Sequence, residues 1–554
     1  MSEKGESGTA ISARLREQSF DELETRRFDC AIIGGGITGA GIAREATLRG
    51  LSVALIEAED FASGTSSRSS KLIHGGLRYL AQGEVKLVRE TALERKRVHR
   101  MAPHLAEPAW MVVPVHSRAG LLKFRAAIGA YEKLGAVADA DRHRNWTGEE
   151  LAREEPALDR KRYPFACAYR EYVTDDARLV LANLRAAVGR GAVAINHASV
   201  RELVCESGAA TGVVAECGLT GRRVRVRAAT IVNAAGPWVE AVRRLEDPAA
   251  KSVLHLSKGV HVVVPQEKLP VRNLLILTAS DRRSVFAIPR GDVVYLGTTD
   301  TSYSAAATLW PAIDLSDVAY LLEPLTRYLS TGPLSPNDCV GAWAGLRPLV
   351  AQKGKAAGEI SRRDEIWIGP AGVVTVAGGK LTGYRRMAND VVDRVFVLMG
   401  RTATLPASDE DEVLPGGAFS GDLATLAAEL AANPKIHQSA AERLARLYGA
   451  EAHEVLALGS EAVVSGGSLL RGEVEWAVER EGAARLEDVL YRRTRVALYG
   501  AALREPLVQP VADLMALRLG WDEARSSLEV ARVRKQLRAD LSFNDDKDAA
   551  SGVH

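Results

Sequence analysis

Three glycines near the N-terminus have the spacing of a phosphate-binding turn. The short apolar run Cys30–Ile33 leads directly into GGGITG, so that Gly34, Gly36 and Gly39 fit the pattern G-x-G-x-x-G. In such a turn the first glycine permits a sharp bend, the second lets backbone approach a pyrophosphate, and the third lets helix and strand pack closely. The helix that follows presents unpaired N–H groups and a partial positive charge to the phosphate.

The next segment completes a nucleotide-binding unit. A helix is expected over Ala40–Arg49, capped by Gly50, and a second strand over Ser52–Ile56. That strand ends at Glu57, where a carboxylate can accept both ribose hydroxyls of an adenosine and disfavours a 2′-phosphate. Strand, turn, helix and acidic end together predict a dinucleotide-binding site that disfavours NADP. They do not distinguish FAD from NAD.

A second segment rich in glycine and hydroxyl groups, Gly64–Tyr79, reads GTSSRSSKLIHGGLRY. A flexible loop could have this composition, but its hydroxyl donors and bare backbone N–H groups also suit a pyrophosphate and the polar edge of an isoalloxazine ring. A β-like run, Thr230–Val232, leads into NAAGPW. In GGKLTGYR, two glycines precede Lys380 and a helix over Tyr384–Met399, whose first N–H groups could face an anionic ligand.

Four cations are candidates for binding an anionic group of a substrate. If the substrate were a small phosphate ester with a secondary alcohol, its oxidation would have three requirements: cations for the dianion, an acceptor for the hydroxyl proton, and an acceptor for the C2 hydride. Out of context, an Arg or Lys is usually a solvated surface charge. The cation candidates are Arg78, Arg347, Arg362 and Lys380, in HGGLRY, GLRPL, ISRRDE and GGKLT.

Histidine is the side chain whose ordinary pKa best suits proton transfer near neutrality. Of the eleven histidines, His261 lies in the β-like run Val260–Val264, and His74 lies in the hydroxyl-rich segment. A lone strand histidine is as often a satisfied core residue, so an arginine-polarised hydroxyl with water as proton acceptor is the alternative. No pattern of metal-ligand spacing is present, and no metal is expected.

Composition excludes several classes of protein. The chain has 554 residues, enough for two to four folding units. Its net charge of +2 gives no argument for nucleic acid. The five scattered cysteines are expected to be reduced thiols in a cytosolic compartment. The polar N-terminus lacks the apolar stretch of a secretory signal, and no apolar run approaches the ~18–20 residues of a bilayer-spanning helix.

The pattern of elements predicts an α/β or α+β architecture. Residues 1–27 are mostly polar and are expected to form an arm. Near residue 402 the composition changes, and TATLPASDEDEVLPGG is typical of a linker. From Leu423 to Leu541, apolar residues recur at helical spacing and predict four or more helices. The last eleven residues are polar.

Taken together, these blocks resemble the FAD-dependent glycerol-3-phosphate dehydrogenases, which are membrane-associated and quinone-linked. The blocks stand in the family's order and cover roughly residues 28 to 500: GGGITGAGIA (34–43), TSSRSSKLIHGGLRYL (65–80), MAPHLAEPAW (101–110), VTDDARLVLAN (173–183), NAAGPW (233–238), SKGVHVVVP (257–265), GTTDT (297–301), GLRPL (345–349), AGGKLTGYR (377–385), LPGG (414–417) and YRRTR (491–495).

The resemblance implies a Rossmann-like, two-dinucleotide-type FAD domain, a substrate domain with an antiparallel sheet, and an all-helical C-terminal cap domain. The expected boundaries are an arm over 1–27, interleaved FAD and substrate domains over 28–405, the cap over 406–543, and a disordered tail over 544–554.

The resemblance also implies roles for individual residues. His261 would be the general base, and Arg347 would lie near the reacting carbon and flavin N5, which takes the C2 hydride. The phosphate end of the substrate would contact Arg78, Tyr79, Arg362 and Lys380. The cofactor would contact Gly34, Gly36, Gly39, Glu57, Thr65, Ser66, Ser70, His74, Gly75, Gly76, Ala235, Gly236, Leu381 and Thr382.

The function implied is oxidation of sn-glycerol 3-phosphate to dihydroxyacetone phosphate, with electrons passed to a membrane quinone. The protein would be cytoplasmic and peripheral on the inner face of the cell membrane. The basic, amphipathic stretch Gly120–Leu134 could lie on lipid or pack on the body. A homodimer is compatible with the sequence, which does not specify the oligomeric state.

Three alternatives stay open. A glycerol-3-phosphate oxidase would give its electrons to O2 and release H2O2; such oxidases carry a central insertion for which there is no room between GTTDT and GLRPL. An amino-acid oxidase of the same superfamily would need one arginine clamp, whereas four cations suggest a phosphate. A non-catalytic, flavin-bearing scaffold would need no hydride-transfer geometry.

Overall fold

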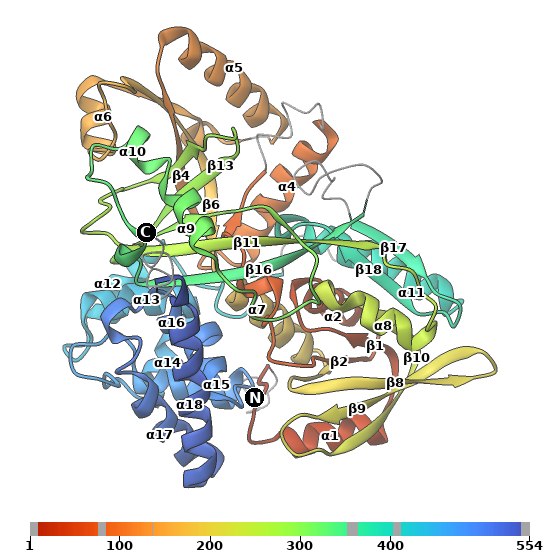
Figure 1. Cartoon of the computed structure of the whole chain (residues 1–554). Helices are drawn as coiled ribbons and strands as arrows, with labels where there is room; N and C mark the ends of the chain where they lie inside the picture. The colour runs from red at the N-terminus through yellow and green to blue at the C-terminus, as the bar shows by residue number, and fades with distance from the viewer. Residues whose placement is uncertain (1–8, 76–84, 136, 352–363, 403–411, 545–554) are drawn as a thin grey trace, which may run out of the picture.

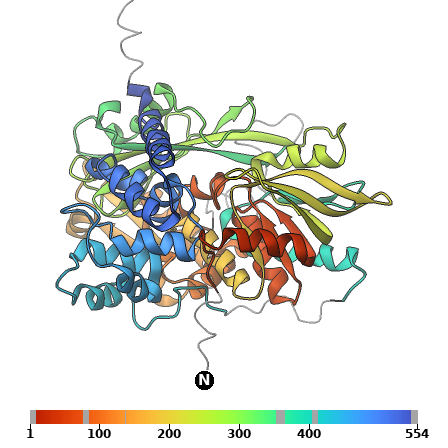
Figure 2. The ribbon, with the colours of Figure 1, turned by 90° about the horizontal axis from the view of Figure 1, so that it is seen from below.

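The computed structural model describes residues 9–75, 85–135, 137–351, 364–402 and 412–544. Within these ranges the chain forms two large β-sheets and a set of C-terminal helices, so the fold is mixed α/β. Figures 1 and 2 show the C-terminal helices, in blue, gathered on one side of the molecule beside both sheets.

The first sheet has eight strands and contains the predicted nucleotide-binding unit. Its central strands are parallel in the order β18–β10–β1–β2–β7, with β17 antiparallel at one edge and β9 and β8 continuing antiparallel from β10. The strands are β1 (Arg27–Ile33), β2 (Val53–Ile56), β7 (Val193–Ile195), β8 (Ala198–Glu206), β9 (Ala209–Cys217), β10 (Arg223–Asn233), β17 (Asp364–Ile368) and β18 (Val374–Gly378).

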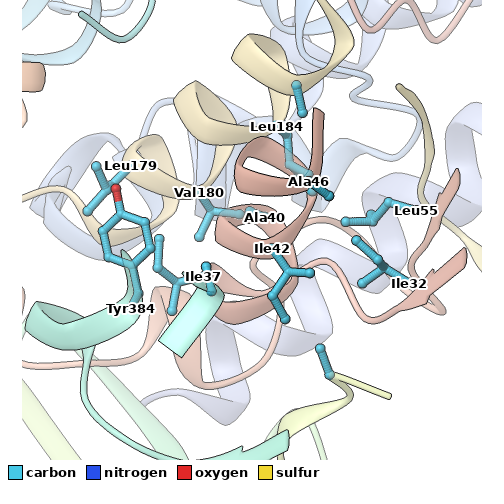
Figure 3. Close-up of a cluster of buried hydrophobic side chains, with 14 of the residues drawn as sticks. Ile32, Ile37, Ala40, Ile42, Ala46, Leu55, Leu179, Val180, Leu184 and Tyr384 are labelled. Atoms are coloured by element: carbon cyan, nitrogen blue, oxygen red, sulfur yellow. The ribbon is translucent and has the colours of Figure 1, made fainter. Parts of the chain in front are cut away.

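Helices cover this sheet on both faces, as a parallel sheet requires. One layer holds α2 (Ile37–Leu48), α7 (Asp176–Val188) and α11 (Tyr384–Leu398). Figure 3 shows how α2 packs between the strands and α7, with Ala40 and Ala46 among larger apolar side chains. The small residues of α2 are needed for this close packing.

The other face of the sheet packs against α1 (Arg16–Thr25), which lies within the predicted N-terminal arm. Its Phe20 and Leu23 are fully buried against the sheet. The helix is otherwise polar, so only two apolar residues mark it in the sequence and no helical periodicity is visible there.

The second sheet has ten strands and is antiparallel except between β4 and β12. It is formed by β3 (Leu72–Ile73), β4 (Ala106–Val115), β5 (Arg144–Thr147), β6 (Phe165–Thr174), β11 (Leu254–Pro265), β12 (Leu274–Thr278), β13 (Ser284–Arg290), β14 (Val293–Gly297), β15 (Thr301–Tyr303) and β16 (Gly341–Val350). In Figure 1 the long β11 and β16 run side by side across the centre of the molecule.

The remaining helices fall into two groups. Those around the sheets are α4 (Val85–Met101), α5 (Arg118–Leu134), α6 (Gly148–Glu154), α8 (Val239–Glu246), α9 (Leu315–Leu322) and α10 (Leu325–Tyr328). The C-terminal helical region, residues 412–544, contains α12 (Leu423–Ala431), α13 (Gln438–Tyr448), α14 (Ala452–Leu458), α15 (Arg471–Arg480), α16 (Val496–Tyr499), α17 (Val508–Leu519) and α18 (Glu523–Ala539).

Most elements expected from the sequence are confirmed, with changed ends. The helix after the glycine turn begins at Ile37 rather than Ala40, and the helix after Lys380 runs from Tyr384 to Leu398. All five cysteines lie in the described ranges and are free thiols. No helix in those ranges combines the length and apolar character needed to cross a membrane.

Candidate active site

A cavity of about 1830 Å³ lies between the two sheets. Its lining includes the glycine turn after β1, residues 63–70, the turn after β10, part of β16, and residues 376–382. The volume exceeds the roughly 300–1,000 Å³ of a pocket for one drug-sized ligand. It can therefore hold a dinucleotide together with a small substrate.

The glycine turn after β1 forms one end of the cavity. Gly34 has a φ of +113°, and a Cβ there would lie 2.5 Å from the Ala234 carbonyl oxygen. A Cβ on Gly39 would overlap the Gly34 carbonyl oxygen, so Gly39 permits the close helix–strand contact rather than lining the cavity. Gly36 is the N-cap of α2, and the N–H of Ile37 donates to the Ser66 hydroxyl (2.9 Å).

Glu57 lies at the end of β2, next to the turn, and lines the cavity. One carboxylate oxygen accepts from the Gly35 N–H (2.6 Å), and the other accepts from the Glu59 N–H (2.9 Å). Burial raises the pKa of Glu57, and these two hydrogen bonds oppose the rise. Each oxygen keeps lone pairs for a further donor, as ribose recognition requires.

Residues 64–74 of the hydroxyl-rich segment run along the cavity between the two sheets. Thr65, Ser66, Ser70 and His74 all line it. The Thr65 hydroxyl donates to the Leu346 carbonyl of β16 (2.6 Å), which ties the segment to the second sheet. Gly75 is buried instead: a Cβ there would overlap the Tyr131 hydroxyl, so the glycine permits packing on α5.

Two turns from the first sheet complete the lining. Ala235 and Gly236 follow β10, where Gly236 has a φ of +54°. Lys380, Leu381 and Thr382 lie between β18 and α11. The Thr382 hydroxyl donates to the His74 carbonyl (3.2 Å), so this turn and the hydroxyl-rich segment meet at the cavity.

Arg347 reaches the cavity from β16 and is partly exposed to it. Its guanidinium lies over Gly259 of β11, where any Cβ would overlap it. It donates to the Thr298 hydroxyl (2.8 Å) and the Thr299 carbonyl (3.1 Å) and forms an ion pair with Asp300 (3.4 Å). These contacts fix the guanidinium at the cavity wall.

His261 lies one layer behind the cavity wall. Its ring is 1% exposed and stacks on Trp343, with centroids 4.9 Å apart. Its Nε2 pairs with the hydroxyl of Ser70, which does line the cavity (2.8 Å). Burial, and then the charges of Lys71 and Arg347, hold the pKa of His261 well below its ordinary value. The ring is therefore neutral near pH 7, and it communicates with the cavity through Ser70.

Four residues expected at the site lie outside the described ranges: Gly76, Arg78, Tyr79 and Arg362.

Sequence reasoning missed two cations of the hydroxyl-rich segment. Arg68 is buried, with its guanidinium 3.8 Å from the ring centroid of Trp310. Lys71 is also buried and pairs with Asp176 (3.3 Å). Arg68 stands between Ser67 and Ser69, and Lys71 directly follows Ser70. This pattern of charges beside hydroxyls was the available signal.

Sequence reasoning also missed a buried cluster of possible metal ligands. The side chains of Asp60, His197 and Asp488 bring one ligand atom each within 4.8 Å of one another. In the structure, Arg492 pairs with both carboxylates, so the cluster is an ion-pair network. The three residues are far apart in the chain and have no metal-ligand spacing.

Comparisons with known proteins agree with this geometry. The profile of the FAD dependent oxidoreductase family matches residues 29–385, and that of the C-terminal domain of alpha-glycerophosphate oxidase matches residues 409–526. The aerobic glycerol-3-phosphate dehydrogenase of Bacillus subtilis (strain 168) is 36% identical over 542 residues, covering 95% of this chain and 98% of that protein. The protein of that name from Staphylococcus aureus (strain USA300) is 35% identical over 544 residues, covering 96% and 98%.

A solved structure is similar over nearly the same length. It is the X-ray structure of the glycerol-3-phosphate dehydrogenase from Bacillus halodurans complexed with FAD. The TM-score is 0.79 at 32% identity, and the match covers 96% of this chain and 99% of that one.

The fold, the glycine turn and the family profile define the class: the chain is an FAD-dependent oxidoreductase, and FAD is its cofactor. Within that class, relatives of one kind match it over almost the full length of both proteins. The chain belongs to the family of aerobic glycerol-3-phosphate dehydrogenases.

The residues present fit FAD. Gly36 and Glu57 would hold the pyrophosphate and the ribose of its adenosine half, because one offers bare backbone at a helix N-terminus and the other offers carboxylate lone pairs. Ser66, Ala235 and Leu381 line the same cavity as Arg347. One cavity therefore joins the nucleotide end to Arg347 and Lys380, two of the four cations proposed for the substrate.

Proposed function

We propose that this chain oxidises sn-glycerol 3-phosphate to dihydroxyacetone phosphate and passes the two electrons to a membrane quinone. The observation that carries the proposal is Arg347, which the second sheet fixes in the cavity that also holds the glycine turn. Membership of the family supports the choice of substrate, because the relatives are named for it.

FAD, when bound, supplies the two-electron acceptor for the C2 hydrogen. The chain's own residues then have to hold the substrate and move one proton. Arg347 would bind the C2 oxygen and stabilise the negative charge that develops as its proton leaves. Lys380, at the start of the turn before α11, would contact the phosphate. Arg78, Tyr79 and Arg362 stay predicted phosphate contacts.

Ser70 and His261 would remove the hydroxyl proton together. The Ser70 hydroxyl faces the cavity and pairs with Nε2 of His261, so a proton accepted by Ser70 can pass to the ring as the serine's own proton moves on. The ring is neutral and can accept it. The dianionic substrate would offset the charges of Lys71 and Arg347 that disfavour an imidazolium. In this relay His261 is still the final proton acceptor, although its ring lies behind the cavity wall and does not touch the substrate.

The first experiment is anaerobic reduction of the purified holoenzyme. Addition of glycerol 3-phosphate should bleach the flavin band, whereas glycerol and an amino acid should not. A yellow protein that glycerol 3-phosphate does not bleach would refute the substrate. Recolouring by a soluble quinone faster than by air would support the dehydrogenase, and the reverse order would support the oxidase that releases H2O2.

Arg347 gives the matched test of the site. Arg347→Met should keep FAD bound but lower kcat/KM roughly 10²–10³-fold, the cost of removing one donor to a developing oxyanion. Arg225→Met removes an exposed arginine of β10 and should leave activity unchanged. Full activity of Arg347→Met would refute the assignment.

Helix α5 supports the quinone and membrane parts of the proposal. Its C-terminal half packs on the body through Ile128 and Tyr131, both buried. Its N-terminal half leaves Leu122 63% exposed, between the cations Arg118 and Lys123. The C-terminal half therefore packs on the body. In the N-terminal half, Leu121 and Phe124 also pack partly on the core, and Leu122 with its neighbouring cations is the part that would meet lipid.

The cavity reaches this same helix. Lys123 and Phe124 of α5 line it, together with apolar and aromatic side chains such as Met111, Tyr163 and Tyr328. An apolar quinone could enter from a lipid surface at this point, and the protein would lie peripherally on the cytoplasmic face of the cell membrane.

Co-sedimentation with phosphatidylglycerol vesicles tests the contact. Leu122→Asp should weaken binding at least fivefold and slow reduction of a long-chain quinone, but leave reduction of a soluble one unchanged. Val397→Asp, at a 71% exposed position of α11, is the control and should bind like the wild type. Equal binding by both variants would exclude α5 as the lipid contact.

A further inference from the structure

Buried charges join the C-terminal helical region to the two loops that form the cavity wall. Four carboxylates lie against four cations, and every one of these side chains is at most 2% exposed. The carboxylates are Asp60, Asp175, Asp176 and Asp488, and the cations are Lys71, Arg492, Arg493 and Arg495. Three of the four cations come from the block YRRTR of the C-terminal region.

The first loop runs from Glu57 to Ser63, both of which line the cavity. Asp60 lies between them, fully buried and turned towards the C-terminal region. Arg492 and Arg493 both donate to its carboxylate, the second through two nitrogens. The Asp60 carbonyl accepts from the Ser63 N–H (3.0 Å), so the ion pairs hold the back of the loop that carries Glu57.

The second loop is residues 64–71, the first part of the hydroxyl-rich segment. Ser69 lines the cavity, and its hydroxyl donates to Asp176 (2.7 Å), which also pairs with Lys71. Arg495 donates to that same carboxylate and to Asp175 (2.8 Å), the N-cap of α7. Arg495 therefore lies directly behind the segment that carries Ser66 and Ser70.

Arg493 contacts the first loop and Arg495 contacts the second, and the two arginines are only two residues apart in the chain. One short piece of backbone therefore sets the distance between the two loops. Arg495 itself has a φ of +64°, a conformation that a non-glycine residue adopts only where its surroundings enforce it. Buried ion pairs contribute little net stability compared with apolar packing of equal volume. Directional guanidinium bonds do fix geometry, and here the geometry they fix is that of the cofactor cavity.

We propose that Arg493 and Arg495 are positioning residues for FAD, and that the C-terminal helical region sets the spacing of the two loops that bind it. The proposal rests on FAD as cofactor and not on the proposed substrate or acceptor, so binding experiments can test it separately. It predicts that substitution of Arg493 or Arg495 lowers the affinity for FAD and does not only lower the stability of the fold.

The experiment compares FAD affinity of the apoprotein for three variants, measured by quenching of flavin fluorescence. Arg495→Met and Arg493→Met should each raise the Kd for FAD at least tenfold and change the fine structure of the bound flavin's visible band. The control is Arg185→Met. Arg185 is also buried and joins α7 to the C-terminal region through Glu451 (2.7 Å), but it contacts neither loop. This variant should keep the Kd within twofold while losing a comparable amount of thermal stability.

A Kd for Arg495→Met equal to that of the control would overturn the proposal. If Arg495→Met does not fold, Arg495→Lys decides, because it keeps the charge but loses the paired nitrogens that contact Asp175. A raised Kd for the lysine variant supports the positioning role, and an unchanged Kd refutes it.

Discussion

The two ends of the cavity are built in different ways. The nucleotide end comes from one continuous stretch, from β1 to Glu57 after β2. Apart from the Glu57 carboxylate, its key groups are backbone N–H and glycine α-carbons. The proposed substrate end is assembled from side chains of β11, β16, the hydroxyl-rich segment and the turn before α11.

This difference decides what each end tolerates. At the nucleotide end, function depends on the absence of atoms, so one added carbon does the most harm. At the substrate end, function depends on the placement of a few polar atoms, so removing one group does the most harm. Substitutions that add atoms therefore test the nucleotide end. Substitutions that remove one polar group at a time test the substrate end.

The largest effect is expected at the nucleotide end, from Gly39→Ala. The new methyl group would overlap the Gly34 carbonyl oxygen, which is backbone and cannot move without opening the turn. We expect FAD affinity to fall more than 100-fold, measured by fluorescence titration of the apoprotein with circular dichroism to check folding.

Gly129→Ala is the matched control, because a Cβ at that position of α5 would meet no atom within 4 Å. If Gly39→Ala does not fold, Gly36→Ala is the milder form: its Cβ would come 3.1 Å from the Ser66 hydroxyl and should weaken binding in a folded protein. Unchanged FAD affinity in Gly39→Ala would show that side chains, not backbone, dominate this end.

A smaller effect is expected at the substrate end, from Ser70→Ala and His261→Gln. If the two act as a relay, each should lower kcat roughly 10²–10⁴-fold, and the double variant should be no slower than the worse single one. Because burial holds the pKa of His261 well below its ordinary value, kcat/KM of the wild type should not fall between pH 8 and pH 6 through protonation of this ring.

His255→Gln, on the same strand, serves as the control and should leave kcat unchanged. Additive losses from Ser70→Ala and His261→Gln would argue against a relay. Retention of full activity by His261→Gln would leave water as the proton acceptor and Arg347 as the group that polarises the hydroxyl.

The same contrast explains what could be predicted from the sequence. The glycine turn, α2 and Glu57 were predicted because their functional geometry follows from local spacing. The place of Arg347 over Gly259 follows from the pairing of β11 with β16, in which Ser257 lies opposite Arg347. The residues around Gly259 and Arg347 in the sequence do not predict how β11 and β16 align.

His261 shows the limit of motif reasoning. Its residue type and strand were predicted, but the layer in which it lies was not, because only the packed structure shows Ser70 between the ring and the cavity. The ion pairs from Arg493 and Arg495 were invisible for the same reason, since their partners lie more than 300 residues away in the chain.

The smallest effect concerns Lys71, which lies behind the substrate end and whose charge bears on His261. Burial lowers the pKa of Lys71 to about 8, while Asp176 opposes the shift. The folded protein thus releases this proton near pH 8, whereas the unfolded chain keeps it to about 10.4. Unfolding takes up a proton within that window, so the free energy of unfolding should rise with pH there.

The rise is expected to be about 1–3 kcal/mol, seen as a growing stability difference between wild type and Lys71→Met in urea denaturation at pH 7.5 and pH 10. Titrating groups whose pKa does not depend on the charge of Lys71 cancel in this difference. Lys258→Met gives the contrast, because Asp314 and Asp317 outweigh burial and raise the pKa of Lys258, so its difference should not grow in this window. If the stability difference between wild type and Lys71→Met does not change with pH, Lys71 stays charged throughout this window. Its positive charge behind the substrate end would then be independent of pH, like that of Arg347.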